Sequence, residues 1–340
     1  MFIPGTDGRL QYQGAVSVET LDSGAVRAWR IHYNERNLHD SELAARAAMP
    51  AGVRIVFESV TTSVSLHLRD VADETKPVDF VVDGGLVATR AVTDAAGTRA
   101  SATVVGVENL DPRVKEIEIW LPHFGSVIVE GVTIDDGAEI VSSGARRPFW
   151  VTYGSSITQC RTADSPTRTW PARAARALGW CHQNMGYGGQ CHLDPLVAFT
   201  IRDLDADVIS LCLGINVYGG ATLSRRTFVP NVIGLVRTIR EAKSITPIVV
   251  MSPIVSPNRE TEPNAVGLTL AEMRDEVHRA ASLLRDAGDQ NLYTIDGRTV
   301  IGAEDAHVMP DGLHPDDAGY ALMAERFADR IRGLNLSLPS

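Results

Sequence analysis

The chain has 340 residues, which is longer than one ordinary domain, so two domains with separate hydrophobic cores are expected. Its formal net charge of −10, without a cluster of Lys and Arg, argues against a nucleic-acid partner. Its four cysteines are widely spaced, which argues against a small disulfide-stapled scaffold.

The N-terminal segment has no basic start followed by an apolar stretch, and no apolar run reaches the length of a membrane span. We therefore expect a cytoplasmic protein without a membrane partner. The sequence leaves the oligomeric state open.

The first part of the chain has the alternating pattern of half-buried strands. Apolar and polar residues alternate at 63–68 and at 115–120. The run 78–82 is followed by an Asp-Gly-Gly step at 83–85, which is typical of a hairpin turn because glycine tolerates a positive φ. Residues 1–145 are therefore predicted to form a β-sandwich or jelly-roll-like accessory domain.

From residue 146 onward, apolar runs alternate with helical patterns. The predicted buried strands are 149–153, 181–185, 208–213, 248–251 and 292–295. The predicted helices are 170–178, 195–202, 227–242, 268–287 and 316–331. Strands that alternate with helices predict an α/β domain with a doubly wound parallel sheet over residues 146–340. Ligands of such sheets bind beyond the carboxyl ends of the strands.

A serine follows the first predicted strand, in the step Gly154, Ser155, Ser156. This position places the Ser156 hydroxyl at the carboxyl edge of the sheet, near the start of a loop, where a nucleophile can meet a substrate. The alternative is an ordinary turn, since Ser and Gly are common there. Thr158 stands where the nucleophile elbow of α/β-hydrolases has its second glycine, so that fold is disfavoured.

Near the C-terminus, Asp311 stands three residues before His314. Within a turn, this spacing lets the carboxylate bind one imidazole nitrogen while the other nitrogen faces a nucleophile. Pro315 is suited to the start of the final helix. The alternative is a turn residue followed by a helix-entry residue, but the position downstream of the serine favours catalysis.

Two further loops follow predicted strands and can supply donors for an oxyanion. Gly189 ends the segment Gly-Tyr-Gly-Gly, where the absence of side chains lets a backbone N–H approach a substrate. Asn216 follows the next strand, and its amide can donate a second hydrogen bond. The alternatives are a glycine-rich turn and a helix-capping asparagine.

The four segments that contain Ser156, Gly189, Asn216 and the pair Asp311 and His314 follow one another in this order along the chain. In this order they resemble the motifs of the SGNH hydrolases, or GDSL family of esterases and acylhydrolases, and the resemblance covers about residues 147–334. The resemblance implies a flavodoxin-like sheet. It also implies that Ser156 is the nucleophile, His314 the base and Asp311 the residue that orients it, with Ser156, Gly189 and Asn216 forming the oxyanion hole. Two positions depart from the family pattern, because Ser155 and Val217 stand where Asp is usual. The branch with an N-terminal β domain also includes acyltransferases that act on natural products.

The sequence also suggests two other interpretations. Two Cys-His pairs, at 181–182 and 191–192, contain residue types that bind zinc, but their spacing fits no common zinc site, so neither a metal nor a cofactor is predicted. The polar, proline-rich stretch 252–268 is long enough to be functional, and its residues Arg259, Glu260 and Glu262 are candidates for substrate contact or for a solvated loop.

The motifs together predict an enzyme that forms an acyl-serine from a carboxylic ester. Hydrolysis by an esterase is the first expectation, since water is always present. The alternative is an acyltransferase that moves the acyl group to a hydroxyl of a natural product or sugar. A catalytically idle carbohydrate-binding protein is a third hypothesis. The expected partner is a small-molecule ester or acyl donor, glycosylated compounds included.

Overall fold

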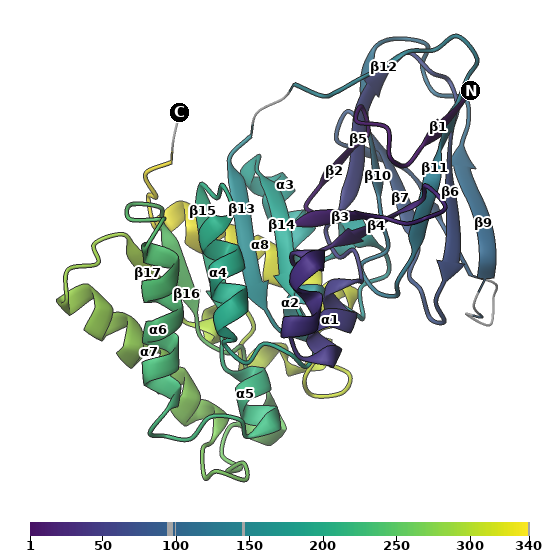
Figure 1. The fold of residues 1–340 in the computed structure, drawn as a ribbon. Coiled ribbons are helices and arrows are strands. Elements are labelled where there is room, and N and C mark those ends of the chain that lie inside the picture. The colour runs from purple at the N-terminus through teal and green to yellow at the C-terminus, as the bar shows by residue number, and fades with distance from the viewer. Residues whose placement is uncertain (94–97, 99, 145–146, 339–340) are drawn as a thin grey trace. The chain divides into compact units, whose positions relative to one another are not determined.

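The computed structural model of the protein describes residues 1–93, 98, 100–144 and 147–338. Its contacts divide the chain into two compact units (Figure 1). The first comprises Met1–Arg146 with the short segment Asp164–Thr167, and the second comprises Arg147–Ala163 with Arg168–Ser340. The predicted domain boundary between residues 145 and 146 lies outside the described residues.

The first unit contains two antiparallel sheets. One has the strand order β3-β4-β11-β6-β9 with β1 beside β11, and the other has the order β12-β5-β10-β7-β8 with β2 beside β5. The strands are β1 (Phe2–Pro4), β2 (Gln11–Gln13), β3 (Ser17–Thr20), β4 (Val26–Trp29), β5 (Arg54–Ser59), β6 (Val64–Val71), β7 (Val78–Val82), β8 (Gly85–Arg90), β9 (Ala100–Val107), β10 (Lys115–Trp120), β11 (Ile128–Ile134) and β12 (Ile140–Val141). A 3₁₀ helix, η1 (Tyr33–Leu38), and the helix α1 (Ser41–Ala47) connect β4 to β5.

Alternating side chains of both sheets form one core. Leu66 on β6, Phe57 on β5 and Ile119 on β10 are all fully buried in it. The predicted β-sandwich is therefore confirmed. The predicted hairpin is β7–β8, in which Asp83 and Gly84 have φ values of 47° and 77°. Positive φ at both central residues is the geometry that matches the twist of paired strands.

The segment Asp164–Thr167 belongs to the first unit because Asp79 binds it. The buried carboxylate of Asp79, on β7, accepts hydrogen bonds from Ser165 Oγ (2.6 Å), Thr167 N–H (3.0 Å) and Thr167 Oγ1 (2.6 Å). A buried carboxylate is stable only with such donors. Asp79 therefore fixes this segment within the β unit.

The second unit is a five-stranded parallel sheet with the order β14-β13-β15-β16-β17. This is the flavodoxin-like strand order, so the predicted fold class is confirmed. The strands are β13 (Phe149–Gly154), β14 (Cys181–Gly186), β15 (Val208–Cys212), β16 (Ile248–Met251) and β17 (Leu292–Ile295). The helices are α2 (Ser156–Gln159), α3 (Trp170–Leu178), α4 (Pro195–Asp203), α5 (Ile215–Gly220), α6 (Phe228–Arg240), α7 (Leu270–Asp286) and α8 (Asp317–Gly333). Three 3₁₀ segments also belong to this unit: η3 (Pro257–Arg259), η4 (Gly297–Thr299) and η5 (Ala303–Val308). A further one, η2 (Pro166–Arg168), spans the end of the segment Asp164–Thr167 that belongs to the first unit.

Helices cover both faces of this sheet (Figure 1). Helices α3 and α8 pack together on one face, and α4, α6 and α7 follow one another on the other. Trp150 of β13 lies in the core beneath α3 and α8, stacked on Phe327 with ring centroids 5.3 Å apart. Its indole N–H donates to Ser210 Oγ at 2.9 Å, which satisfies the buried donor. Trp150 is thus a core residue.

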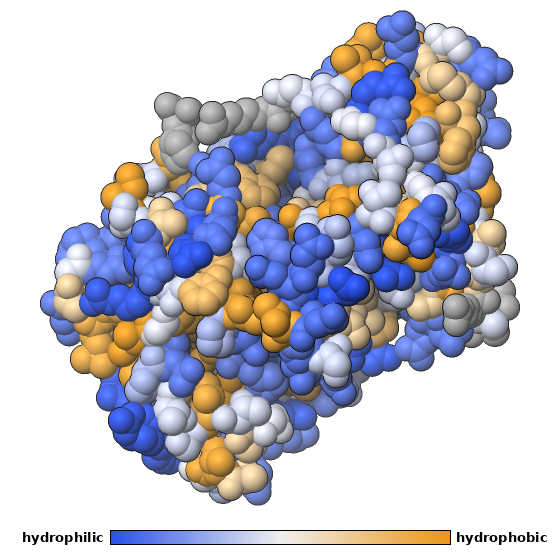
Figure 2. Space-filling view, viewed as in Figure 1, coloured by the Kyte–Doolittle hydropathy of each residue, from blue (hydrophilic) through white to orange (hydrophobic). Residues whose placement is uncertain are grey.

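No helix within the described residues is both long enough and apolar enough to cross a membrane. Hydrophilic residues cover much of the face shown in Figure 2, with smaller hydrophobic groups among them. Such scattered apolar residues are normal on protein surfaces.

Candidate active site

Ser156 is the first residue of α2, directly beyond the carboxyl end of β13. The sequence placed it near the start of a loop, and that local expectation is wrong: the chain turns at once into a four-residue helix. The Ser155 side chain caps this helix by accepting from the N–H of Ile157 at 3.2 Å. Gly154 is required here, because a Cβ would lie 2.9 Å from Cβ of Thr158. The helix therefore folds tightly back over the strand.

The structure brings His314 and Asp311 to Ser156. Ser156 Oγ lies 2.8 Å from His314 Nε2, and His314 Nδ1 lies 2.6 Å from Asp311 Oδ2. Because a carboxylate only accepts, Nδ1 carries the proton, and Nε2 of the neutral ring accepts from the Ser156 hydroxyl. The three side chains thus form one hydrogen-bonded chain from hydroxyl to imidazole to carboxylate.

The turn that carries His314 is organised by Asp311 itself. Asp311 Oδ1 accepts from the N–H groups of Leu313 (2.9 Å) and His314 (2.7 Å), and Gly312 adopts a φ of 69°. Burial raises the pKa of the Asp311 carboxyl, but hydrogen bonds from the His314 ring and from these two N–H groups outweigh it and hold the pKa at about 2. The carboxylate is therefore charged at neutral pH.

The last helix begins slightly later than predicted. Helix α8 starts at Asp317, and the Asp316 side chain caps it by accepting from the N–H of Gly319 at 2.8 Å. Pro315 therefore precedes the cap instead of starting the helix. The capping carboxylate matches the positive end of the helix dipole.

Gly189 lies in the loop after β14 with a φ of 77°. The N–H of the preceding Gly188 donates to Gln159 Oε1 of α2 at 2.9 Å. A Cβ on Gly188 would lie 3.5 Å from Cβ of Ser156, so the bare backbone of this loop passes beside the serine. The loop is therefore held against α2, where a backbone N–H can reach an oxygen bound near Ser156.

Asn216 is the second residue of α5, and Gly214 rather than Asn216 is the capping residue. Its Oδ1 accepts from the N–H of Cys191 at 3.0 Å, which joins α5 to the loop after β14. This hydrogen bond fixes the orientation of the side-chain amide of Asn216. The other atom of that amide, Nδ2, is a hydrogen-bond donor. The structure therefore places all five predicted residues at the carboxyl edge of the sheet.

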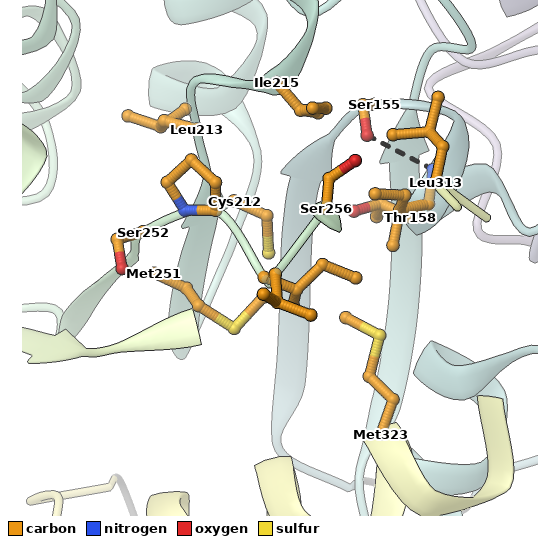
Figure 3. Close-up of a pocket in the computed structure, with 14 residues that line it drawn as sticks. Ser155, Thr158, Cys212, Leu213, Ile215, Met251, Ser252, Ser256, Leu313 and Met323 are labelled. Carbon is orange, nitrogen blue, oxygen red and sulfur yellow. Dashed lines mark hydrogen bonds between the residues drawn. The ribbon is translucent and has the colours of Figure 1, made fainter. Parts of the chain in front are cut away.

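A small apolar cavity lies next to this region of the sheet edge (Figure 3). Its volume is about 20 Å³, which is room for about one water molecule rather than an acyl group. Its walls include the sequence neighbours of the predicted residues, and they are Ser155, Ile157, Ile215 and Leu313. The cavity therefore adjoins the site but is too small to be its binding surface.

The two Cys-His pairs do not form a ligand cluster. Within the described part of the chain, no group of three or more His, Cys, Asp or Glu side chains is placed to hold a metal ion. Cys191 is buried, and burial raises the pKa of its thiol. His192 instead contacts the loop after β14, with Nε2 2.9 Å from the carbonyl oxygen of Gly189.

Three residues that the sequence does not indicate contact the loops of the predicted residues: Gln159 binds Gly188, His192 binds Gly189 and Ser256 binds Gly312. None of them lies in a catalytic motif: His192 belongs to one of the two Cys-His pairs, and Ser256 lies in the stretch 252–268. The stretch 252–268 was predicted to be a substrate-contacting or solvated loop. Within it, Glu260 binds Arg274 instead, with two contacts of 2.9 Å.

Comparisons with known proteins give two matches to family models. A model of the GDSL-like lipase/acylhydrolase family matches residues 148–332, and a model of the SsfX3 N-terminal domain matches residues 10–130. A comparison with curated protein sequences returned no match.

Among solved structures, the chain is similar to SsfX3, a salicylyl-acyltransferase from a tetracycline biosynthetic pathway. The two share 31% identity over 98% of this chain and 97% of that chain, with a TM-score of 0.91. A lipase-like protein of the GDSL type from Bacteroides ovatus has 20% identity over 100% of this chain and 99% of that chain, with a TM-score of 0.80. A family two carbohydrate esterase from Cellvibrio japonicus has 14% identity over 98% and 97% of the two chains, with a TM-score of 0.68.

The last two likenesses show the fold, whereas the family model covers more than half of the chain and contains every residue of the hydrogen-bonded site. The chain therefore belongs to the GDSL-like lipase/acylhydrolase family, the SGNH group of ester-cleaving and acyl-transferring enzymes.

Proposed function

We propose that this enzyme forms an acyl-serine at Ser156, with His314 as general base and Asp311 as the residue that orients and stabilises the imidazole. The observation that carries the proposal is the unbroken contact from Ser156 Oγ to His314 to Asp311, at 2.8 and 2.6 Å. Such an arrangement activates a hydroxyl that is otherwise a weak nucleophile.

In the first step, Ser156 Oγ attacks the ester carbonyl carbon while its proton passes to His314 Nε2. The carbonyl π electrons move to oxygen, and the N–H groups of Ser156 and Gly189 with Nδ2 of Asn216 stabilise the resulting oxyanion. The intermediate then collapses, the bond to the alkoxy oxygen breaks, and that oxygen takes the proton from His314. The products are a free alcohol and an acyl-serine.

In the second step, we propose that water is the basal acceptor. His314 takes a proton from water as the oxygen attacks the acyl carbon, and the acid product leaves as Ser156 recovers its proton. Solvent access supports this step, because the His314 side chain is 22% exposed and that of Asp311 is 54% exposed. The enzyme is then an esterase.

A second candidate function is transfer of the acyl group to a hydroxyl of a small molecule. A specific observation favours it: SsfX3, with 31% identity over nearly the whole of both chains, is a salicylyl-acyltransferase, and the N-terminal unit here matches the model of its N-terminal domain. An alcohol activated by His314 replaces water in the same second step.

We also propose that the substrate is a small-molecule ester or acyl donor, glycosylated compounds included. We propose further that residues 1–145 form an accessory domain and residues 146–340 the catalytic domain. We further propose a cytoplasmic location. The four cysteines, all free thiols, support it, because thiols persist in a reducing compartment.

The test of the nucleophile is labelling with a fluorophosphonate and mapping of the adduct by mass spectrometry. We expect the label on Ser156, a loss of labelling in Ser156→Ala, and strongly slowed labelling in His314→Ala. Ser155→Ala is the matched control, because it removes the neighbouring hydroxyl and should still be labelled. Labelling at another residue, or full labelling of His314→Ala, contradicts the proposal.

The acceptor is tested with p-nitrophenyl esters in the presence and absence of hydroxyl compounds. Release of p-nitrophenol reports acylation, and the ratio of free acid to new ester reports the second step. Free acid as the sole product with every acceptor identifies an esterase. A new ester formed at the expense of free acid identifies an acyltransferase.

A further inference from the structure

The loop that follows β16 contacts the turn that carries His314. Ser256, which is 1% exposed, donates its hydroxyl hydrogen to the carbonyl oxygen of Gly312 at 2.7 Å. The same Oγ accepts from Nη1 of Arg259 at 3.0 Å. The Ser256 hydroxyl therefore has both a donor and an acceptor partner, which fixes its orientation.

The contact reaches the turn from the side opposite to Asp311. Asp311 Oδ1 accepts from the N–H groups of Leu313 and His314, whereas Ser256 donates to the carbonyl of Gly312, the residue between Asp311 and Leu313. Gly312 has a φ of 69°, so the peptide beside it has a conformation that few residues adopt. Two opposed contacts on one turn restrict its rotation more than either alone.

The loop itself is anchored in the protein interior. Glu260 Oε1 accepts from the N–H of Ser256 at 3.0 Å and also binds Nη2 of Arg274 on α7 at 2.9 Å. Arg274, whose side chain is 2% exposed, further donates from Nε to the carbonyl oxygen of Pro253 at 3.0 Å. Removing one partner of such a pair leaves a charge without its counter-charge, which is costly. Through these contacts the Glu260–Arg274 pair holds both Pro253, near the start of the loop, and Ser256.

From these contacts we infer that Ser256 is a positioning residue for the reaction: held by the Glu260–Arg274 pair, it fixes the turn that aims His314 at Ser156. The inference rests on the proposed roles of Ser156 and His314. Its physical basis is that proton transfer requires donor and acceptor within hydrogen-bond distance, so a small displacement of His314 slows the reaction without changing substrate binding.

Ser252 provides a matched control on the same loop. It is also 1% exposed and its Oγ also has a buried hydrogen bond, accepting from the N–H of Gly297 at 3.0 Å. Both serines line the cavity of Figure 3. Gly297 begins η4, a separate segment that precedes the His314 turn. Ser252→Ala and Ser256→Ala thus each remove one buried hydroxyl, but the hydroxyl of Ser256 is hydrogen-bonded to that turn and the hydroxyl of Ser252 to Gly297.

The experiment measures kcat and KM with p-nitrophenyl acetate, and the melting temperature, for Ser256→Ala, Ser256→Thr, Ser252→Ala and Ser156→Ala. We expect kcat of Ser256→Ala to fall about tenfold, while its KM stays within about twofold of the parent value. A misaligned proton transfer raises the reaction barrier enough to explain a change of this size. Ser256→Thr keeps the hydroxyl and should retain most of the rate. Ser252→Ala should melt about as early as Ser256→Ala yet keep its kcat.

The inference is overturned if kcat of Ser256→Ala stays within twofold of the parent enzyme, or if Ser252→Ala loses as much. A folded Ser256→Thr that is as slow as Ser256→Ala also overturns it, because the hydroxyl is then not responsible. Ser156→Ala separates this result from failure of the proposed function. If Ser156→Ala retains activity, the proposed nucleophile is wrong; if only Ser156→Ala is inactive, the positioning inference alone fails.

Discussion

His192 holds the loop that contains Gly189. Its Nε2 lies 2.9 Å from the carbonyl oxygen of Gly189, and its Nδ1 lies 2.9 Å from Oγ1 of Thr222, just beyond α5. Because a carbonyl only accepts, Nε2 carries the proton, and Nδ1 of the neutral ring accepts from the Thr222 hydroxyl. The imidazole therefore links the loop that contains Gly189 to the segment just after the helix that contains Asn216, and these two residues are two of the three proposed oxyanion donors.

We predict that His192→Leu lowers kcat about tenfold with little change in KM. Without the imidazole, the Gly189 loop loses one of its tethers, and an oxyanion donor acts mainly in the transition state. Steady-state kinetics with p-nitrophenyl acetate measures the effect. His192→Gln is the matched control, because its amide can donate to Gly189 and accept from Thr222. Equal losses in both variants contradict this account of His192.

Gly186 marks the closest approach of β14 to α2. A Cβ there would lie 2.6 Å from the carbonyl carbon of Thr158 and closer still to the backbone nitrogen of Gln159. Backbone atoms cannot rotate away as a side chain can, so Gly186→Ala must push α2 and Ser156 aside. We predict a loss of about 3 kcal/mol in the free energy of unfolding, measured in urea, together with most of the activity.

Gly219, within α5, serves as the control for this substitution, because a Cβ there meets nothing within 4 Å. Gly219→Ala should leave the free energy of unfolding unchanged or raise it by a few tenths of a kcal/mol, since alanine favours a helix over glycine. Similar destabilisation by both substitutions indicates that crowding at α2 is not the cause.

The long elements of the α/β unit could be predicted from the sequence. The strand Ile248–Met251 and the helix Trp170–Leu178 have the predicted bounds, because the strand is a fully buried apolar run and the helix has a proline in its first turn and a glycine with φ of 71° at its end. By contrast, α2 and α5 have four and six residues, too few for helical periodicity. The strands β1 to β4 have only three or four residues each, and none was predicted.

The site divides in the same way. Ser156, Gly189 and Asn216 each follow a buried strand, and a parallel sheet collects such positions at one edge, so their proximity could be expected. Ser256 and Gly312 are 56 residues apart, and their contact depends on how two loops pack. The local sequence pattern does not indicate which residues of two separate loops will contact each other. For the same reason it did not indicate that Glu260 binds the buried Arg274.

The Glu260–Arg274 pair should contribute strongly to stability when one partner is removed. Arg274→Met replaces the aliphatic part of the side chain with one of similar length, but it removes the guanidinium and leaves the Glu260 carboxylate without its cation. We predict a loss of about 3 kcal/mol in the free energy of unfolding, measured by denaturation in urea, because an unpaired charge that is largely buried is costly.

Arg279, also on α7, is the control, since its pair with Glu276 is at the surface and Arg279 is 55% exposed. Arg279→Met should cost less than about 1 kcal/mol. The double variant Arg274→Met with Glu260→Leu should recover part of the loss, because no charge is then left unpaired. A double variant less stable than Arg274→Met points instead to the apolar contacts of these residues.

Asp311→Asn should reduce kcat about a thousandfold or more, because an amide cannot stabilise the imidazolium that forms when His314 accepts the proton of Ser156, and it favours the wrong ring tautomer. The measurement is the rate of p-nitrophenol release. Asp316→Asn is the control: Asp316 caps α8 close by, and asparagine caps a helix about as well as aspartate. A large kcat loss in the control, or a small one in Asp311→Asn, contradicts the role proposed for Asp311.

The same substitution should change how stability depends on pH. The pKa of Asp311 is about 2 in the folded protein, against about 3.9 for an unfolded aspartate, so its contribution is fully present above about pH 4 and is lost as the pH falls toward 2. Because the side chain is 54% exposed, solvent limits this contribution to about 1 kcal/mol. Urea denaturation at pH 5 and at pH 2.5 should show the parent enzyme losing its advantage over Asp311→Asn at the lower pH. An advantage that is equal at both values means that the charge of Asp311 does not stabilise the fold.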